Sequence, residues 1–265
     1  MSAANPETVL ITGASSGIGL ELAKCFAADG CRLILVARNQ DALEKLAGVL
    51  RRENQVEVIV LPTDISQTGT PTWIFEELSG RKVFVDILVN NAGFGAIGPF
   101  DELPLERHLE MLQVNITALT ALTGLFLPGM IERRRGGILN VASVAGFVPG
   151  PGMAVYYATK AFVLFFTEAL AGELEGAGLN VSALCPGPTA TNFGNVAGSK
   201  SVNLVRVSRM TSMEVARAGH RGFRRGRVVA VPGLQNKFLV SLVRIMPRIF
   251  VRKIARRFNG FQRKA

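Results

Sequence analysis

The residues best suited to chemistry in this sequence are a tyrosine and a lysine four positions apart, Tyr156 and Lys160. In a helix this spacing places both side chains on one face, where the ammonium favours the phenolate electrostatically. The phenol, whose ordinary pKa is about 10, would then titrate closer to neutrality and exchange protons with a substrate. Tyr157 lacks such a partner, because Ala161 stands four residues after it. Tyr156 is therefore the candidate general acid and base.

A serine thirteen positions before Tyr156, Ser143, is its candidate partner. The interval between them is rich in turn-forming residues: Gly146, Pro149, Gly150, Pro151 and Gly152. These residues favour a reversal of the chain that brings the hydroxyl and the phenol to one carbonyl oxygen. Taken singly, such a serine is more often a helix cap and such a tyrosine more often part of the core. Their occurrence together at this separation favours a catalytic role.

A second group of residues has the pattern of a nucleotide-binding turn. The apolar run Thr8–Thr12 leads directly into Gly13, Ser15, Ser16, Gly17, Ile18 and Gly19, and helix-forming sequence follows. Glycines let the backbone turn tightly and approach a pyrophosphate, while a helix N-terminus offers free N–H donors. A plain strand-to-helix turn also uses glycine, but the strand, turn and helix in succession predict a dinucleotide site.

The end of the second apolar run indicates which dinucleotide is bound. An NAD site needs a carboxylate about 20 residues beyond the glycines, whereas a 2′-phosphate favours an arginine. The sequence has Ala37 at this place and Arg38 next to it. We expect NADPH (or NADP+) as cofactor with Arg38 on the 2′-phosphate, the alternative being an ordinary exposed arginine.

The spacing Thr-Gly-x-x-x-Gly-x-Gly over residues 12–19, together with the Tyr-x-x-x-Lys pair, resembles the short-chain dehydrogenase/reductase family. Asn90-Asn91-Ala92-Gly93 strengthens the resemblance, which extends over residues 8–231. It implies that hydride passes between nicotinamide and a substrate carbon while Tyr156 gives or takes the proton. Ser143 would then hold the substrate oxygen, and Lys160 would contact the nicotinamide ribose.

The same resemblance assigns further residues. It implies that Asn115 holds a water in a proton relay, that Asp64 and Asn91 flank the adenine, and that Thr189 contacts the nicotinamide carboxamide. Asp64 and Asn91 are also common turn or cap residues. The remaining cofactor contacts implied by the family pattern are Ala92, Gly93, Pro186, Gly187 and Thr191.

Seven short apolar runs alternate with longer helix-compatible segments. The runs cover residues 8–12, 33–37, 56–61, 87–90, 138–141, 181–185 and 227–231, and the helical segments cover 18–28, 41–52, 73–78, 105–131 and 154–175. Nearly continuous apolar runs are typical of strands covered on both faces. The alternation predicts an α/β fold, a doubly wound and mostly parallel Rossmann sheet whose strand ends carry the residues above.

Length and composition limit the classes of protein. With 265 residues, 48% hydrophobic and 19% charged, the sequence predicts one domain. Three cysteines without paired spacing and two distant histidines, His108 and His220, predict reduced thiols, a cytoplasmic location and no metal site. No secretory signal and no uninterrupted apolar run of spanning length are expected.

Positive charge is concentrated near the C-terminus. Residues 206–265 hold sixteen Lys or Arg and one acid, Glu214, within a net charge of +10 for the whole chain. We divide the chain into a catalytic domain, 1–235, with a substrate lid at about 192–222, and a basic amphipathic extension, 236–265. Thr211 and Glu214 predict a capping box that opens a helix to Arg221.

In the extension, one helical face is apolar and the other basic, and Pro247 interrupts the helix. The apolar face holds Phe250, Val251, Ile254 and Phe258, and the basic face holds Arg248, Arg252, Lys253, Arg256 and Arg257. Such a helix either lies on an anionic membrane surface or covers the substrate cleft or a partner subunit. Nucleic acid ranks last, because no base-stacking aromatic pattern accompanies the charge.

The predicted function is carbonyl reduction, or the reverse alcohol oxidation, with NADPH. Apolar residues in the expected lid, Phe193, Val196, Val202, Leu204 and Val205, favour an apolar or lipid-like substrate. The alternative is a catalytically silent NADPH-binding or membrane-associated regulatory protein. A homodimer or homotetramer through the Phe162, Phe165, Phe166 and Leu170 side of one helix is expected, although burial in the monomer explains that side equally well.

Overall fold

Parallel strands form a central sheet in the order β3-β2-β1-β4-β5-β6-β9. The computed structural model describes residues 6–190 and 210–258. The strands are β1 (Thr8–Thr12), β2 (Arg32–Ala37), β3 (Val58–Pro62), β4 (Ile87–Asn90), β5 (Gly137–Val141), β6 (Asn180–Leu184) and β9 (Val229–Ala230). Every residue of β1, β4 and β5 is buried. The doubly wound parallel sheet expected from the continuous apolar runs is confirmed.

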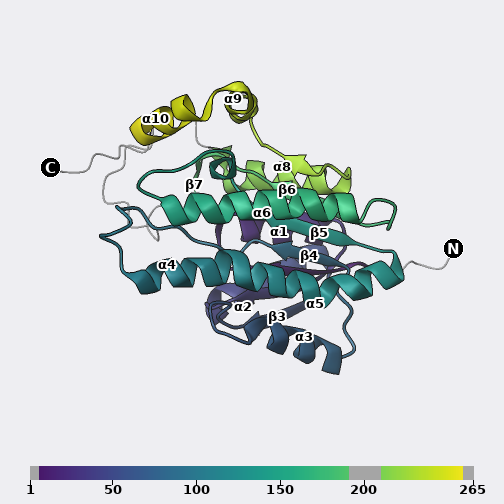
Figure 1. Ribbon diagram of the computed structural model, residues 1–265. Helices are drawn as coiled ribbons and strands as arrows, with labels where there is room; N and C mark the ends of the chain where they lie inside the picture. The colour runs from purple at the N-terminus through teal and green to yellow at the C-terminus, as the bar shows by residue number, and fades with distance from the viewer. Residues whose placement is uncertain (1–5, 191–209, 259–265) are drawn as a thin grey trace.

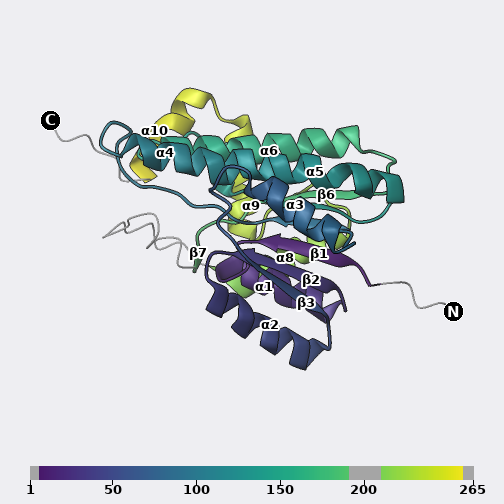
Figure 2. The same cartoon turned by 90° about the horizontal axis from the view of Figure 1, so that it is seen from below.

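Helices cover both faces of the sheet (Figure 2). One face carries α1 (Gly17–Ala28), α2 (Gln40–Asn54) and α8 (Ser212–Arg224), and the other carries α3 (Thr70–Gly80), α4 (Leu105–Leu112), α5 (Ala118–Arg133) and α6 (Ala154–Glu173). Two large apolar clusters fill the spaces between these layers, and burial of their aliphatic side chains stabilises the fold. The layers hold the strand ends rigidly in place.

The long helix expected over residues 105–131 is interrupted. Between α4 and α5 the backbone widens into a π-helical turn, η1 (Gln113–Thr117), and Asn115 lies inside it. Such turns disturb the regular ladder of backbone hydrogen bonds and often occur at functional sites. No periodicity in the local sequence distinguishes this turn from the helix around it.

The capping box predicted for α8 is present. The Glu214 backbone N–H donates to Thr211 Oγ1 at 3.2 Å, and the Thr211 N–H donates to Glu214 Oε2 at 2.8 Å. The helix continues to Arg224, beyond the expected end at Arg221. Just before it, β8 (Met210–Thr211) pairs with β7 (Thr189–Ala190) in a small parallel sheet that the sequence did not predict. Most of the expected lid, including its apolar set, lies outside the described residues.

The basic extension forms two helices above the sheet, α9 (Leu234–Ile245) and α10 (Arg248–Phe258) (Figure 1). Pro247 separates them, as expected for a residue that lacks a backbone N–H. The expected boundary at residue 236 falls inside the first turn of α9.

Two helical stretches, Leu105–Arg133 and Ala154–Glu173, are long and apolar enough to cross a bilayer by length and composition alone. Core helices of soluble proteins pass the same test, and these two pack against the central sheet through buried residues such as Phe126 and Val163. Part of their apolar character is explained by that packing, and the rest is exposed on the surface.

Candidate active site

The carboxyl ends of the strands open into a cavity of about 1080 Å³, called the chamber below. Residues expected at the site that line it are Gly13, Ser15, Ser16, Gly17, Ile18, Arg38, Asp64, Asn91, Ala92, Gly93, Ser143, Tyr156, Lys160, Pro186, Gly187 and Thr189. Gly19 and Asn115 lie just behind its wall, and Thr191 lies outside the described residues. Ligands of open α/β sheets bind at this edge because the connecting loops diverge there.

The side chain of Asn91 packs against the backbone of the glycine-rich turn. Its Nδ2 donates to the backbone oxygens of Thr12 and Gly13 at 2.8 and 3.2 Å. A Cβ on Gly13, where φ is +66°, would lie 2.8 Å from this nitrogen, and a Cβ on Gly19 would lie 2.4 Å from it. Glycine is therefore needed at both positions for the amide to reach the turn.

A residue that we did not single out from the sequence, Thr12, fixes the ends of β1 and β4 to each other. Its Oγ1 accepts the backbone N–H groups of Asn91 and Ala92, each at 3.0 Å. The signal was present, since Thr12 is the first residue of the glycine motif. Together with Asn91 it gives the cradle a fixed shape before any ligand binds.

The residues at this end fit a dinucleotide. Ser16 precedes α1 without a side-chain cap, which leaves the first N–H groups of the helix facing the chamber. Arg38 is 72% exposed at the end of β2, and its Nη1 lies 3.8 Å from Asp64 Oδ2. Asp64 also accepts the Ser66 backbone N–H at 2.9 Å. The loose ion pair leaves the guanidinium accessible to a phosphate.

Ser143 and Tyr156 meet in the chamber. Ser143 Oγ accepts the Ala145 N–H at 3.1 Å and so caps the short helix η2 (Val144–Phe147). Its hydroxyl also shares a side-chain hydrogen bond with Tyr156, and this bond lowers the pKa of the phenol. The turn between the two residues therefore brings hydroxyl and phenol together, as their spacing indicated.

The acidity of Tyr156 differs from the expectation. Burial raises the pKa of Tyr156 to about 12 and outweighs the bond to Ser143. Lys160 is almost fully buried, its Nζ donates to the Val141 oxygen at 2.7 Å, and it lies 6.0 Å from the centre of the tyrosine ring. Burial lowers the pKa of Lys160 to about 8. The expected lowering of the tyrosine pKa is thus wrong for this arrangement, because desolvation dominates at that distance.

Asn115 joins three parts of the site. Its Oδ1 accepts the Phe94 N–H at 3.1 Å, and its Nδ2 donates to the Phe94 oxygen at 2.9 Å and to Thr159 Oγ1 at 3.0 Å. The Thr159 hydroxyl in turn donates to the backbone carbonyl oxygen of Tyr156 at 2.7 Å. Both amide hydrogens are engaged, so the side chain primarily holds the loop after β4 against α6.

Thr159 is the second residue that sequence reasoning missed. It is fully buried and lies between Tyr156 and Lys160 in the same motif. Its hydroxyl fixes the orientation of Asn115, which the spacing of the motif does not reveal. A Cβ on Gly93 would lie 3.0 Å from Asn115 Oδ1 and 3.4 Å from Lys160 Nζ, which shows how closely these residues pack.

Tyr157 has a packing contact that separates it from Tyr156. A Cβ on Gly150 would lie 2.2 Å from an atom of the Tyr157 ring, so the ring lies directly on the backbone of that turn. The two tyrosine rings meet edge to face with centroids 6.0 Å apart. This contact indicates that the Tyr157 ring packs against the turn.

The far part of the chamber is apolar and is walled by α9 and α10. The inner sides of these helices contribute Leu239, Val243, Met246, Val251 and Ala255, opposite Phe147 and Met153. The basic extension therefore covers the cleft, which is one of the alternatives that the sequence left open. A substrate bound here meets aliphatic groups on one side and Tyr156 on the other.

Metal-ligating residues do not gather in this site. Within residues 6–190 and 210–258, no group of three or more His, Cys, Asp and Glu side chains is placed to hold a metal ion. The three cysteines are free thiols. His108 packs on the Phe100 ring and His220 bonds to Asp29, both away from the chamber. The glycine-rich turn and the Ser143–Tyr156 pair have the arrangement expected of a dinucleotide-dependent oxidoreductase.

Comparisons with known proteins agree with this class. Residues 7–201 match a family model described as short chain dehydrogenase. The very-long-chain 3-oxoacyl-CoA reductase of Rattus norvegicus is 34% identical over 194 residues, 72% of this chain and 62% of its own length. The chain thus spans less than two thirds of that relative.

Two solved structures have the same architecture. A short-chain dehydrogenase from Sphingobium yanoikuyae in complex with NADPH has a TM-score of 0.80 at 36% identity, over 91% of this chain and 96% of that one. A short chain dehydrogenase/reductase from Burkholderia phymatum in complex with NAD has a TM-score of 0.79 at 26% identity, over 92% and 94%.

The chain belongs to the short chain dehydrogenase family.

Proposed function

We propose that this protein interconverts a carbonyl and an alcohol with NADPH or NADP+, and that its substrate is apolar. The observation that carries the proposal is the hydrogen bond between Ser143 and Tyr156 inside a chamber with a dinucleotide cradle at one end and an aliphatic wall at the other. The rat relative, named as a 3-oxoacyl-CoA reductase, supports a long-chain carbonyl substrate.

In the proposed reaction the bound nicotinamide would supply or accept the hydride. Tyr156, whose pKa of about 12 keeps it protonated at neutral pH, donates its proton to the carbonyl oxygen during reduction. The Ser143 hydroxyl holds the same oxygen and aligns it with the phenol. Lys160 binds the nicotinamide ribose, and Asn115 holds the loop and helix that position these groups.

The other proposed contacts follow the chamber wall. The glycine-rich turn receives the pyrophosphate, Asp64 and Asn91 flank the adenosine, and residues 186–191 contact the nicotinamide, with Thr191 carried over from the family pattern alone. We keep the division into a catalytic domain, 1–235, and a basic extension, 236–265, as part of the proposal.

Replacing the phenol tests the catalytic assignment. Tyr156→Phe should lower turnover of a ketone and aldehyde panel by about 10²- to 10⁴-fold, the range for loss of a general acid. NADPH binding, followed by fluorescence titration, should remain. Tyr157→Phe is the matched control and should keep most activity, since its ring packs on Gly150.

Equal losses in the two tyrosine variants would contradict the assignment. A wild-type protein that binds NADPH but oxidises it with no carbonyl in the panel would favour the silent regulatory alternative instead.

The preference for NADPH rests on Arg38. Arg38→Asp places a carboxylate where it would repel a 2′-phosphate and hold a ribose hydroxyl, so the ratio of kcat/KM for NADPH over NADH should fall at least tenfold. Arg52→Asp, at an exposed arginine on α2, is the control. Unchanged discrimination in Arg38→Asp would contradict the phosphate contact.

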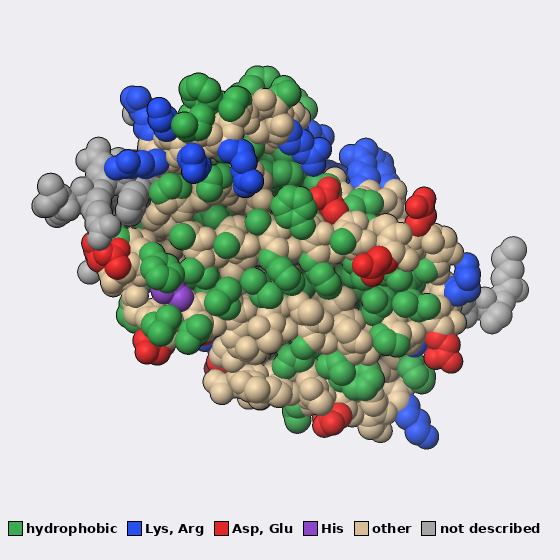
Figure 3. Space-filling view, in the orientation of Figure 1, with side chains coloured by type: hydrophobic (Ala, Val, Ile, Leu, Met, Phe, Trp, Pro, Cys, Tyr) green, Lys and Arg blue, Asp and Glu red, His purple; other side chains and the backbone are tan. Residues whose placement is uncertain are grey.

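We further propose a cytoplasmic protein that forms a homodimer or homotetramer. Apolar side chains are exposed in the middle of one face, over α5 and α6 (Figure 3). The exposed large hydrophobic residues of these two helices include Ile131, Phe162 and Phe165. Leu170, which the sequence placed on the same side, is buried in the monomer core, and Phe166 is partly buried. The exposed part of this side is therefore the middle of α6, around Phe162 and Phe165.

A further inference from the structure

The outer sides of α9 and α10 expose an unusually apolar surface. We call it the crest, and it consists of Leu234, Phe238, Ile245, Ile249, Phe250 and Ile254. Their exposed fractions run from 50% to 83%, although large aliphatic and aromatic side chains are normally buried. In Figure 3 apolar side chains appear at the top of the molecule, over these helices. A contiguous apolar patch of this kind marks an interaction surface.

Positive charge borders the crest. A second cavity, of about 870 Å³, lies beside α9 and is lined by Arg217, Arg221, Arg225, Arg227, Lys237 and Arg244. Its one carboxylate, Glu214, is held in the capping box with Thr211. On the other side α10 carries Arg248, Arg252, Lys253, Arg256 and Arg257.

Close ion pairs do not neutralise these cations in the part of the chain that the structure describes. Among the described residues, none of the six that line the second cavity forms an ion pair with a carboxylate. The segment 191–209 contains neither Asp nor Glu in its sequence. The border of the crest therefore carries uncompensated positive charge that attracts anions.

The chamber opens at the crest. Phe238, Leu242 and Ile254 line the chamber and are nevertheless 70%, 40% and 53% exposed. Val251 and Ala255, one helical turn apart on α10, are buried on its inner side. Apolar side chains of both helices therefore lie where the chamber meets the outer surface.

We propose that α9 and α10 dock on the surface of an anionic phospholipid bilayer. The crest enters the interfacial region, and the arginines and lysines around it contact lipid phosphates, which is the pattern of interfacial helices. The mouth of the chamber then faces the lipid, and apolar substrates enter from the bilayer. This entry route rests on the proposed function, whereas docking itself does not.

Charge decides between the bilayer and a second copy of the chain. In a two-fold contact the same surface patch faces itself. Two crests in contact would bring the arginines of both copies together with one acid each, Glu214, to offset them. An anionic lipid surface satisfies the apolar and the positive parts of this face together.

Vesicle flotation of the full chain saturated with NADPH tests the proposal. We expect at least tenfold tighter binding to phosphatidylcholine vesicles containing about one third phosphatidylglycerol than to pure phosphatidylcholine. Binding should weaken as salt rises from 0.05 to 0.5 M, because the ionic contacts are exposed. Saturating NADPH fills the cofactor cradle, so that lipid phosphates cannot bind there.

Paired variants separate the crest from general hydrophobicity. Ile245→Asp with Phe250→Asp, two crest residues outside the chamber wall, should reduce affinity for anionic vesicles at least tenfold. Phe84→Asp with Leu105→Asp, at two similarly exposed sites away from the crest, should bind like wild type. Thermal melts show that each variant is folded.

Equal reduction in both pairs, or equal binding to neutral and anionic vesicles, would overturn the proposal. Absence of vesicle binding, with an oligomer that the crest pair dissociates in sedimentation, would assign the crest to a second copy. Turnover of a small water-soluble ketone should be the same in the crest pair and wild type. If the wild type does not turn over such a ketone, the proposed function is contradicted. The flotation experiment then still tests docking by itself.

Discussion

At the scale of the single residue, burial decides the protonation states of the site. Lys160 is buried and Tyr156 is partly buried in the chamber wall, and desolvation disfavours the charged form of each, so the pKa of the phenol rises and that of the ammonium falls. Cys185, in the same enclosed region, has its pKa raised to about 12 and remains a thiol. A lysine one helical turn from a tyrosine therefore does not by itself lower the pKa of the tyrosine.

The lowered pKa of Lys160 predicts a pH dependence. Below about pH 8 the ammonium is present and can bind the nicotinamide ribose, and above that pH it is progressively lost. We expect kcat/KM for NADPH, which reports ionisations of the free enzyme, to fall as pH rises above about 8. Lys160→Arg keeps the charge at high pH and should remove this fall. A flat wild-type profile up to pH 9.5 would contradict the assignment.

At the scale of the element, two helical glycines differ in how closely they are packed. Gly19 in α1 lies against the Gly13 oxygen and the Asn91 amide, and a Cβ there would meet each at 2.4 Å. Gly48 in α2 has no neighbour within 4 Å of its Cβ position. The same substitution therefore has opposite expected effects in the two helices.

Gly19→Ala should lower the free energy of unfolding by about 1–3 kcal/mol, the usual cost of overpacking, and weaken NADPH binding because the turn must shift. Gly48→Ala should raise the free energy of unfolding by up to about 1 kcal/mol, the difference in helix propensity. Urea unfolding and NADPH titration measure both effects. A higher free energy of unfolding for Gly19→Ala would contradict the predicted overpacking at this position.

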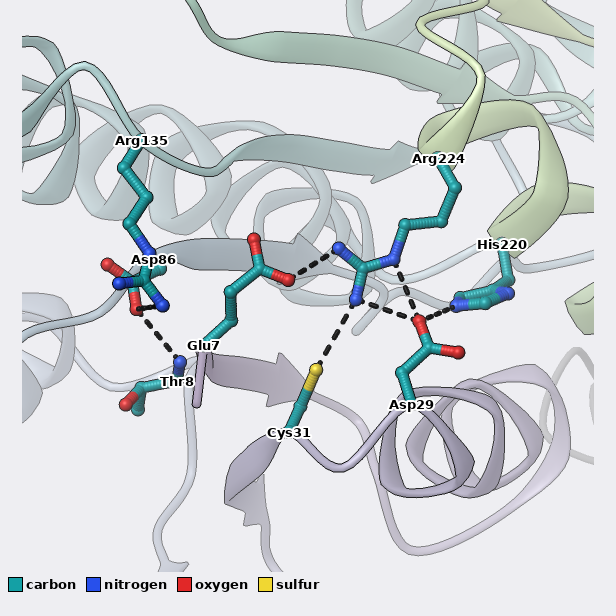
Figure 4. Close-up of polar contacts among 8 residues, drawn as sticks. All are labelled: Glu7, Thr8, Asp29, Cys31, Asp86, Arg135, His220 and Arg224. Carbon is teal, nitrogen blue, oxygen red and sulfur yellow. Dashed lines mark hydrogen bonds and ion pairs between the residues drawn. The ribbon is translucent and has the colours of Figure 1, made fainter. Parts of the chain in front are cut away.

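At the scale of the whole molecule, an ionic cluster joins distant parts of the chain near the starts of β1 and β2 (Figure 4). Arg224 at the end of α8 bonds to Glu7 before β1 at 2.6 Å and to Asp29 after α1 at 2.8 Å. His220 Nε2 lies 2.9 Å from the same Asp29 carboxylate. Charge pairs between segments this far apart oppose separation of α8 from α1.

Arg224→Met should lower the free energy of unfolding by about 1–2 kcal/mol, because the partly buried Glu7 carboxylate loses its charged partner and the exposed Asp29 carboxylate keeps only His220. Arg225→Met, at the adjacent exposed residue, is the control and should change stability by less than about 0.5 kcal/mol. Thermal and urea unfolding report the difference. Equal effects would show that the cluster contributes no net stability.

Local patterns were sufficient for the class of fold and for most of the site. Continuous apolar runs indicated buried parallel strands, and parallel strands place their carboxyl ends at one edge, so Gly13, Arg38, Asn91 and Ser143 were expected to line one cavity. The turn between Ser143 and Tyr156 was likewise readable from its prolines and glycines. These features depend on backbone preferences of neighbouring residues, which the sequence states directly.

The sequence by itself determined the class of fold, a doubly wound parallel sheet, and the position of the glycine-rich turn, and it singled out Tyr156 as the candidate proton-exchanging residue. Only the tertiary structure decided the sign of the Tyr156 pKa shift, the bond from Thr159 to Asn115, and the use of α9 and α10 as the apolar wall of the chamber. The physical reason is that desolvation and packing arise from side chains far apart in the chain, and their contacts exist only after the layers have closed around the sheet.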